Sequence, residues 1–289
     1  IADTFGLTLQ LIDNENIDSK EYERITPEIL EPFLSDDVAL VTFQVLQYRS
    51  GALNPIREIT ALAKKYGVLT IWDASHAAGS VHLDFEKNDI DLAVGCTYKY
   101  LSSGPGSPAY LYVKKSLQKQ LQVPIQGWFA QKNQFEMGPN FIKSNNIRGF
   151  QIASPSIMGL RCVNIAIDMI YRAGMAAIVD KAQKGTEIMI AFYDEWLKQF
   201  GFRLMTPREE AKRGGHISLM HESARNISVA LRNYENTIVD FREPNQIRIA
   251  ISPLAMTYSE LHEGLKRIRY IAETKSFEKI ENFDGKKIY

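Results

Sequence analysis

The most constraining feature of this sequence is an alternation of apolar, β-rich runs with a helical segment in its first half. VALVTFQVL (residues 38–46) is a continuous apolar run, as expected of a strand buried on both faces of a sheet. PIREITALAKKYG (residues 55–67) follows as a helix, with proline in its first turn and glycine just past its end. Three further apolar runs, VLTIWD, DLAVGCT and PAYLYV, continue the alternation as strands. This order predicts an α/β domain built on a mostly parallel sheet.

The pattern changes after Pro155. Long helical periodicities cover residues 157–200, shorter strands follow at HISLMH and IRIAIS, and the last helix is predicted at about Tyr258 to Thr274. We therefore expect a domain boundary near Ser154. A large α/β domain would occupy residues 1–154, and linking helices with a smaller α+β domain would occupy residues 155–289.

Composition and charge argue against several classes of protein. The 34 basic and 34 acidic residues cancel, so no net field favours nucleic acid or an anionic membrane. No apolar run reaches the roughly 18 residues of a membrane span, and no signal peptide is recognisable. Cys96 and Cys162 lie in apolar surroundings without CxxC spacing, so neither a disulfide framework nor a zinc site is indicated. We expect a cytoplasmic protein, and the opening IADTFGLTLQ, without methionine, indicates a missing upstream portion or a trimmed first element.

Polar residues lie at or just after the carboxyl ends of the predicted strands. In open parallel sheets, ligands and catalytic residues are usually found at these ends. YRSG (residues 48–51) follows the first strand, Asp73 ends the second with His76 three residues on, and Lys99 follows the third. Each has an ordinary structural explanation: Asp73 as a helix N-cap, His76 as a partly buried histidine, Lys99 as a solvated turn residue. Their joint order and placement favour a functional site.

A strand-end aspartate and a loop lysine after the next strand suit pyridoxal phosphate. The lysine amine can form a Schiff base with the aldehyde of this cofactor. The carboxylate can pair with the ring nitrogen and keep it protonated. The small residues Ser102 to Ser107 let the backbone turn sharply and approach the ring. Lys99 is therefore predicted to anchor the cofactor, with Asp73 as its charge partner.

Six motifs occur in the order found in the kynureninase family, which this sequence resembles. They are YRSG, IWDASHAAG, DLAVGCTYKYLSSGPGSPAYLYV, GWFAQ, RGFQIASPSI and IRIAISPL, and they span Tyr48 to Leu254. Kynureninases are fold-type-I pyridoxal-phosphate enzymes of the aminotransferase class V group. The Tyr-Lys-Tyr-Leu run is the most specific element, because the related cysteine desulfurases usually carry histidine before the lysine.

The resemblance implies roles for individual residues around the cofactor. Asp73 would pair with the pyridine nitrogen, and His76 would lie beside the ring near its phenolic oxygen. Tyr98 would bond the phosphate and would also be the favoured proton donor. Gln44 stands where the family usually has Ser or Thr facing the cofactor.

Three further positions carry implied roles in substrate and subunit contacts. Trp128 and Ser154 match positions that reach the phosphate from the neighbouring subunit, which implies a homodimer with shared sites. Arg248 matches the arginine that binds the substrate α-carboxylate in a bidentate manner. Ser154 is also expected to read the 3-hydroxyl of the substrate. The ordinary explanations are a core or interface aromatic for Trp128 and a surface ion pair for Arg248.

The reaction that the resemblance implies belongs to tryptophan catabolism, on the route to NAD biosynthesis. L-Kynurenine or its 3-hydroxy form is hydrolysed at the Cβ–Cγ bond to anthranilate or 3-hydroxyanthranilate and L-alanine. Water adds to the γ-carbonyl, and Tyr98 returns the proton.

The sequence also departs from the family. GWFAQ replaces the usual GWFGH, so Ala130 and Gln131 differ, and LSSGPG replaces LNGGPG at Ser102 and Ser103. We expect the family's first phosphate-binding Thr pair, its ring-stacking aromatic with the acidic partner, and its substrate-facing histidine to lie upstream of Ile1.

Two other functions stay open. A cysteine desulfurase or other class V lyase would keep the cofactor but needs a cysteine on a mobile loop, a position that neither Cys96 nor Cys162 occupies. A catalytically degenerate binding protein would keep the fold alone. The retained site set argues against that second alternative.

Overall fold

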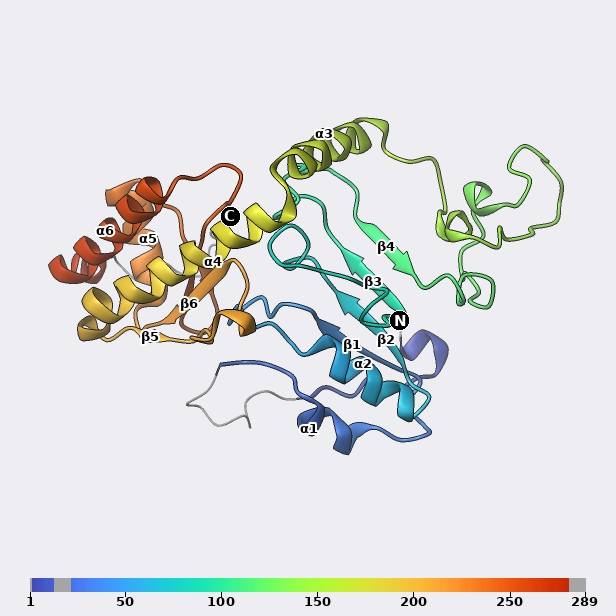
Figure 1. The fold of residues 1–289 in the computed structure, drawn as a ribbon, viewed down its shortest axis with the longest axis horizontal. Helices are drawn as coiled ribbons and strands as arrows, with labels where there is room; N and C mark the ends of the chain where they lie inside the picture. The colour runs from blue at the N-terminus through green and yellow to red at the C-terminus, as the bar shows by residue number, and fades with distance from the viewer. Residues whose placement is uncertain (1, 13–21, 281–289) are drawn as a thin grey trace.

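The computed structural model describes residues 2–12 and 22–280, which form two four-stranded sheets with flanking helices (Figure 1). The first sheet lies in the first half of the chain and the second in the last third (Figure 1). Short helical turns join these elements, at Asp3–Phe5, Glu31–Phe33, Trp128–Ala130, Ile147–Phe150, Tyr193–Leu197, Lys198–Phe200, Glu210–Lys212 and Ser276–Lys279.

The first sheet has the strand order β1-β2-β3-β4, and the strand bounds are Leu40–Gln44, Leu69–Asp73, Leu92–Gly95 and Tyr110–Val113. β1, β2 and β3 run parallel, whereas β4 is antiparallel to β3. Gln44 pairs with Asp73, and Asp73 pairs with Val94, so the carboxyl ends of three strands lie together. The prediction of a mostly parallel α/β sheet is confirmed.

Helix α2 (Ile56–Lys65) covers one face of this sheet, and the short α1 (Pro27–Leu30) precedes it. Pro55 is the N-cap residue of α2. Gly67, just beyond the end of α2, has φ +71°, a left-handed conformation that glycine adopts without strain. The indole Nε1 of the fully buried Trp72 donates to Thr60 Oγ1 over 3.0 Å, which satisfies both polar groups inside the core.

The prediction that the strand at residues 38–46 is buried on both faces is wrong. Leu40 is 43% exposed, and no residue of β1 (Leu40–Gln44) is fully buried. Val94 on β3 and Leu111 on β4 are exposed as well. The physical reason is that α2 packs on one face, while the described residues leave much of the opposite face uncovered. The continuous apolar sequence of this strand therefore did not mean that both of its faces are buried.

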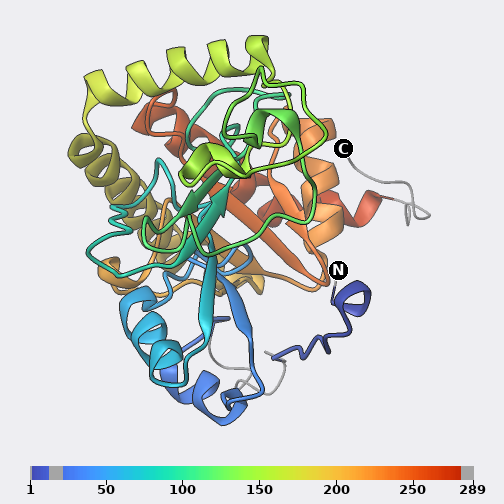
Figure 2. The same cartoon turned by 90° about the vertical axis from the view of Figure 1, so that its right-hand side faces the viewer.

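Long helices α3 (Ile157–Ala173) and α4 (Met175–Phe192) connect the two sheets. Ser156 caps α3 by accepting from the backbone N–H of Gly159 over 3.3 Å. α3 lies along the outside of the molecule in both ribbon views (Figures 1 and 2), and many of its apolar side chains are exposed. α4 is more deeply buried and packs against the second sheet.

The second sheet has the order β5-β6-β8-β7, with all neighbours antiparallel and with bounds Arg203–Leu204, His216–Met220, Gln246–Ala250 and Asp240–Arg242. Helices α5 (Ala224–Glu235) and α6 (Tyr258–Thr274) complete a separate hydrophobic core. Thr257 and Glu260 form a reciprocal capping box at the start of α6, and the predicted bounds of this helix are confirmed. The domain boundary near Ser154 stays a prediction.

A short junction joins the two sheets through backbone hydrogen bonds. The N–H of Leu53 donates to the carbonyl of Lys212 over 2.8 Å, and the N–H of Gly214 donates to that of Gly51 over 3.0 Å. Thr206 Oγ1 also donates to the Ser50 carbonyl over 2.6 Å. These bonds fix the second sheet beside the loop that follows β1.

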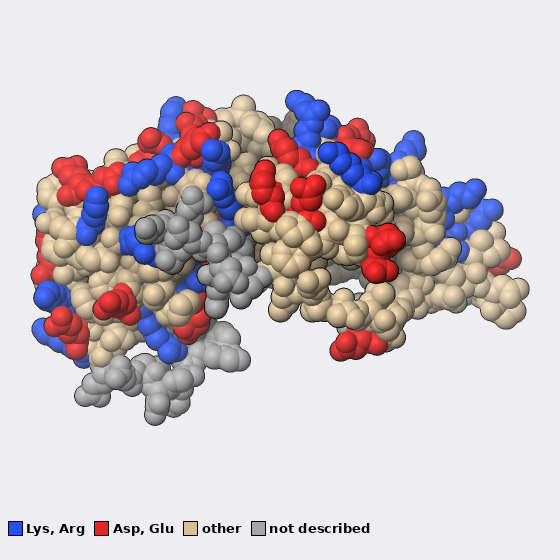
Figure 3. All heavy atoms as spheres, turned by 90° about the horizontal axis from the view of Figure 1, so that it is seen from below, with Lys and Arg blue, Asp and Glu red and all other residues tan. Residues whose placement is uncertain are grey.

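No single helix in the described residues is long and apolar enough to cross a membrane, although the bent pair formed by α3 with residues 175–200 meets the length and composition test. On the face drawn in Figure 3, Lys and Arg side chains are interspersed with Asp and Glu, and no large area carries one sign alone. That mixture accords with a formal net charge of +0.

The second core predicts a clear stability difference between two isoleucines. Ile227 on α5 is fully buried, whereas Ile238 is exposed. Ile227→Ala should lower the free energy of unfolding by about 2–5 kcal/mol, because it deletes buried methyl groups and leaves a cavity. Ile238→Ala, the matched control, should change it by less than about 0.5 kcal/mol. Urea unfolding followed by circular dichroism measures both, and equal losses would contradict the described core.

Candidate active site

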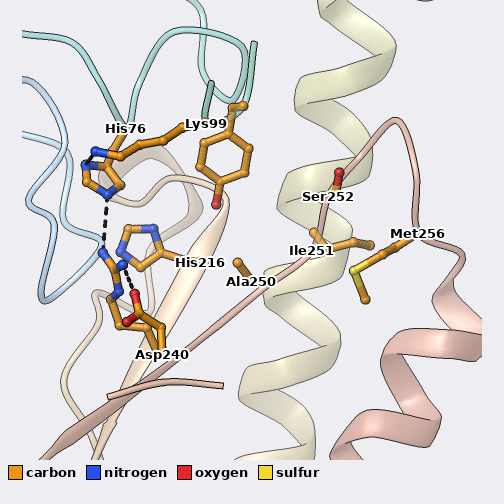
Figure 4. Close-up of a pocket in the computed structure, with 10 residues that line it drawn as sticks. His76, Lys99, His216, Asp240, Ala250, Ile251, Ser252 and Met256 are labelled. Atoms are coloured by element: carbon orange, nitrogen blue, oxygen red, sulfur yellow. Dashed lines mark hydrogen bonds and ion pairs between the residues drawn. The ribbon is translucent and has the colours of Figure 1, made fainter. Parts of the chain in front are cut away.

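A cavity of about 350 Å³ lies between the loops of the first sheet and the strands of the second (Figure 4). Its lining residues are His76, Lys99, Tyr100, His216, Asp240, Arg248, Ala250, Ile251, Ser252 and Met256. Three of them, His76, Lys99 and Arg248, were predicted as site residues. The cavity therefore gathers residues from both halves of the chain.

Lys99 reaches the cavity from the loop after β3. Ser103 closes this loop by donating its backbone N–H to the Thr97 carbonyl over 3.0 Å, and Ser102 takes a left-handed φ of +61°. The Lys99 Nζ atom lies 3.4 Å from His76 Nδ1 and 5.8 Å from the centre of the Tyr98 ring. The lysine is held by local turn geometry and points toward the histidine (Figure 4).

His76 lies in the turn after β2. Ser80 Oγ donates to the His76 carbonyl over 2.7 Å, which anchors the turn. Burial is the main cause that lowers the pKa of His76 to about 4, and the nearby charges of Lys99 and Arg248 lower it further. The imidazole is therefore neutral at physiological pH.

Arg248 comes from β8 in the second sheet. One of its nitrogens, Nη2, forms an ion pair with Asp240, which faces it directly across the β7–β8 pair. The other, Nη1, donates to the Tyr48 carbonyl and lies 3.3 Å from His76 Nε2. The Arg248 side chain is only 12% exposed. The guanidinium is thus fixed at one end of the cavity and faces the loop that carries YRSG.

His216 is a cavity residue that sequence reasoning missed. It is 3% exposed, and its Nε2 atom has no hydrogen-bond partner among the described residues. Burial, followed by the charge of Arg248, lowers its pKa to about 3. Gly51 has φ +73°, and a Cβ there would lie 2.6 Å from the His216 carbonyl oxygen, so only glycine allows this approach.

Asp240 and Tyr100 were missed as well. The signal for Asp240 was present, because opposite charges at Asp240 and Arg248 flank a hairpin and become cross-strand neighbours. Tyr100 is the second tyrosine of the YKY run. Only the first one, Tyr98, was given a role from the sequence. No sequence signal marks Ile251 or Met256, because apolar residues at helix and strand ends are common.

Three predicted cofactor residues lie outside the cavity lining: Asp73 and Gln44 at strand ends, and Tyr98 in the loop after β3. Asp73 ends β2, and its Oδ1 accepts from the backbone N–H of Ser75 over 2.8 Å. This contact caps a turn, and the helix N-cap interpretation is wrong because the structure describes no helix between β2 and β3. Gln44 ends β1, and its Oε1 accepts from the Tyr48 N–H over 2.7 Å. Tyr98 is exposed, and the nearby charge of Cys96 is the main cause that raises its pKa, so its hydroxyl keeps its proton.

Trp128 and Ser154 do not join the other predicted residues within this chain. Trp128 is exposed and stacks edge-on with Phe129, with ring centres 4.6 Å apart. Ser154 is exposed in the segment before α3. Neither residue lines the cavity.

The two cysteines also lie outside the cavity lining. Cys96 is half-buried, and its thiol contacts the Ser75 carbonyl at 3.8 Å. Cys162 is exposed on α3, which corrects the expectation that both cysteines lie in apolar surroundings.

The buried His216 predicts a dependence of stability on pH. Its folded-state pKa of about 3 is below the unfolded value of 6.5, so the unfolded chain binds a proton in this window while the folded chain does not. Stability should therefore rise with pH from about 3 to 6.5 and level off above it. His216→Gln should lower this slope by about 1.4 kcal/mol per pH unit. Urea unfolding between these limits measures it, and an unchanged slope would contradict a neutral His216.

Comparisons with known proteins show that the sequence is similar to kynureninases. Residues 178–268 match the family model described as the kynureninase C-terminal domain. The kynureninase of Pseudomonas fluorescens is 32% identical over 272 residues, which are 94% of this chain and 62% of that relative. The chain thus spans about 62% of the length of the curated relatives that it matches.

Two solved structures establish the fold. A cysteine desulfurase from Thermococcus onnurineus NA1 has a TM-score of 0.77 and 17% identity, covering 94% of this chain and 68% of that one. A mutant of C-DES with glycine covalently linked to the PLP cofactor has a TM-score of 0.79 and 18% identity, covering 93% and 69%. The predicted fold, that of the fold-type-I pyridoxal-phosphate enzymes, is confirmed. Residues 178–268 match the kynureninase C-terminal domain model, and through most of its length this chain is similar in sequence to kynureninases.

Proposed function

We propose that this chain carries the activity of a kynureninase. The reaction is hydrolysis of the Cβ–Cγ bond of L-kynurenine or 3-hydroxykynurenine, with pyridoxal phosphate, to L-alanine and anthranilate or its 3-hydroxy form. One observation carries the proposal: Lys99 and His76 from the first sheet meet Arg248 from the second in a single cavity. The similarity to the P. fluorescens kynureninase supports it.

The residues at the strand ends fit pyridoxal phosphate. Asp73 and Lys99 follow neighbouring parallel strands, so a carboxylate and an amine border the same edge of the sheet. Asp73 uses Oδ1 in its turn, and its Oδ2 has no hydrogen-bond partner among the described residues, which leaves an acceptor for a protonated ring nitrogen. Tyr98 offers an exposed hydroxyl next to the lysine for the phosphate.

When bound, pyridoxal phosphate supplies an aldehyde for covalent attachment of an amino acid and an electron-withdrawing ring. The chain supplies the remaining functions. Lys99 would provide the amine for attachment, and Asp73 would hold a proton on the ring nitrogen by ion pairing. Tyr98 holds a proton on its hydroxyl and can return it to substrate carbon.

Arg248 is suited to bind the α-carboxylate of the substrate. A guanidinium has five donors in a planar fork that matches a carboxylate. Asp240 and the Tyr48 carbonyl hold this fork in place, so little side-chain entropy is lost when a ligand binds. The apolar residues Ile251 and Met256 line the same cavity.

Nothing in the described residues favours the desulfurase alternative. That reaction needs a thiol that reaches the substrate, and neither Cys96 nor Cys162 lines the cavity. The cysteine desulfurases among the similar structures are related to this chain by fold alone. A degenerate binding protein would retain the cavity but not turnover, so the assay below separates it from an enzyme.

The homodimer with shared sites is part of the proposal. Ile157, Met158 and Tyr171 are exposed on α3, and Trp128 is exposed on a segment that Figure 1 draws far from the second sheet. Exposed apolar side chains in such numbers are typical of an interaction surface. A second copy would cover them and bring Trp128 and Ser154 to its neighbour's phosphate.

Lys99→Ala should lower the rate of kynurenine hydrolysis about a thousandfold or more, because no other amine would attach the cofactor. Formation of anthranilate and alanine from L-kynurenine is measured with added pyridoxal phosphate, and L-cysteine serves as the desulfurase substrate. Lys87→Ala, an exposed loop lysine outside the cavity, is the matched control and should keep wild-type activity. A Lys99→Ala protein that stays yellow and borohydride-sensitive would show that another lysine is the anchor.

Shared sites predict complementation between two inactive variants. Lys99→Ala and Trp128→Ala are mixed after mild dissociation, so that about half of the dimers are hybrids with one intact site each. The mixture should recover about a quarter of wild-type activity. Light scattering on the same samples reports the oligomeric state. If the mixture stays inactive while hybrids form, Trp128 does not serve its neighbour's site.

A further inference from the structure

His76 lies between two nitrogen groups that are both cationic in their ordinary state. Its Nδ1 is 3.4 Å from Lys99 Nζ, and its Nε2 is 3.3 Å from Arg248 Nη1 (Figure 4). The two contacts use opposite ends of the same ring. They connect the predicted cofactor lysine to the predicted carboxylate-binding arginine through one imidazole.

The chemistry of the three groups fixes the direction of these contacts. A guanidinium has donors and no acceptor, so at Nε2 the arginine donates and the histidine accepts. The ring is neutral, since burial is the main cause that lowers the pKa of His76, and an imidazolium would have no acceptor for the arginine donor. A neutral imidazole carries one N–H and one lone pair. With Nε2 accepting, the proton must be on Nδ1.

The Nδ1–H group then faces Lys99 Nζ and needs an acceptor there. A lysine ammonium has three donors and no acceptor, whereas the uncharged amine has a lone pair. The contact is therefore favourable only when Lys99 has lost its proton. An N–H of His76 directed at an ammonium would be repulsive.

Arg248 cannot easily turn away from His76. Its Nη2 is ion-paired with Asp240, and its Nη1 donates to the Tyr48 carbonyl. The two hydrogens on Nη1 can serve Tyr48 and His76 together. The arginine is a fixed donor, and the tautomer of His76 follows from it.

We propose that His76 is a positioning residue: Arg248 fixes its Nδ1–H tautomer, and this N–H favours the uncharged, nucleophilic form of the Lys99 amine before cofactor binds. The use of that amine rests on the proposed function. In its capture of an aldehyde, the amine lone pair attacks the carbonyl carbon. One C=N bond forms, and the two amine hydrogens leave with the carbonyl oxygen as water.

Other ionisable groups around Lys99 and His76 modulate this arrangement. They are Asp73, Tyr98, Tyr100, His216, Asp240, Arg242 and Arg248. Asp73 raises the pKa of His76, and Arg248 and Arg242 lower it. Asp240 is paired with both of those arginines. The arginine charges are thus partly compensated, and the hydrogen-bond direction decides the protonation pattern.

The tautomer can be read directly by ¹⁵N NMR of histidine side chains in the cofactor-free chain. His76 is assigned by its loss in His76→Phe. The expected spectrum has the proton on Nδ1 at neutral pH, with a move to Nε2, the usual tautomer, in Arg248→Met. An Nε2–H tautomer or an imidazolium in the wild-type protein would overturn the proposal, and this needs no variant at the arginine to fold.

The state of Lys99 is measured by acetylation with acetic anhydride in the same cofactor-free chain. Peptide mass spectrometry gives the labelling of Lys99 relative to Lys87, an internal reference on an exposed loop. Across a pH series, His76→Phe should lower the Lys99 signal at pH 7 by about threefold to tenfold, the effect of one net hydrogen bond. It should also shift the half-maximum upward in pH. A pH profile that His76→Phe leaves unchanged would overturn the proposal.

These readouts separate the inference from the proposed function. Neither uses pyridoxal phosphate, so a chain that fails to hydrolyse kynurenine but has the expected tautomer and pH profile retains the His76 role. Conversely, normal kynurenine hydrolysis with an Nε2–H tautomer would remove the His76 role alone.

Discussion

The cavity depends on the backbone junction between the two sheets. Hydrogen bonds from Leu53 to Lys212 and from Gly214 to Gly51 hold the second sheet against the loop that follows β1. Without that contact, Arg248 would have no Tyr48 carbonyl to bind and no His76 within reach. Backbone bonds suit this task because they depend on chain geometry and not on side-chain rotamers. Each sheet has its own hydrophobic core, and the cavity with the candidate site residues lies between the two.

The cavity also brings several ionisable side chains close together. Arg248, whose side chain is 12% exposed, is ion-paired with Asp240, whose side chain is 43% exposed. Tyr48 and His76 also contact Arg248, and Arg242 also pairs with Asp240. Removing Asp240 is the costly change, because it would leave the largely buried guanidinium without its carboxylate partner. The neutral state of His76 and His216 has the same origin, since burial penalises the protonated ring. The arginine charge is thus balanced by Asp240, while the two imidazoles stay uncharged.

Much of the fold could be predicted from the sequence, and the cavity only in part. The strand and helix order was readable because each element carries a strong period and clear end signals, such as Pro55 and Gly67 around α2. Lys99 and Asp73 could be found because they follow strands. Asp240 carried a signal that was missed, its charge opposite to that of Arg248 across a hairpin, whereas His216 could not be found, since its place in the cavity arises from a contact with Gly51 far along the chain. The prediction that β1 is buried on both faces was wrong, because an apolar sequence alone does not determine which elements pack on each face of the strand.

The close approach of Gly51 to His216 has a consequence for engineering. A hybrid that exchanges the domain over residues 178–268 with that of a relative would bring in a new partner for Gly51 while keeping the old loop. The fit between the two parts leaves no room for a β-carbon, so the graft succeeds only if the donor backbone follows the same path at residue 216. Exchange points in this fold are therefore best chosen so that residues 50–53 and 206–216 come from the same parent.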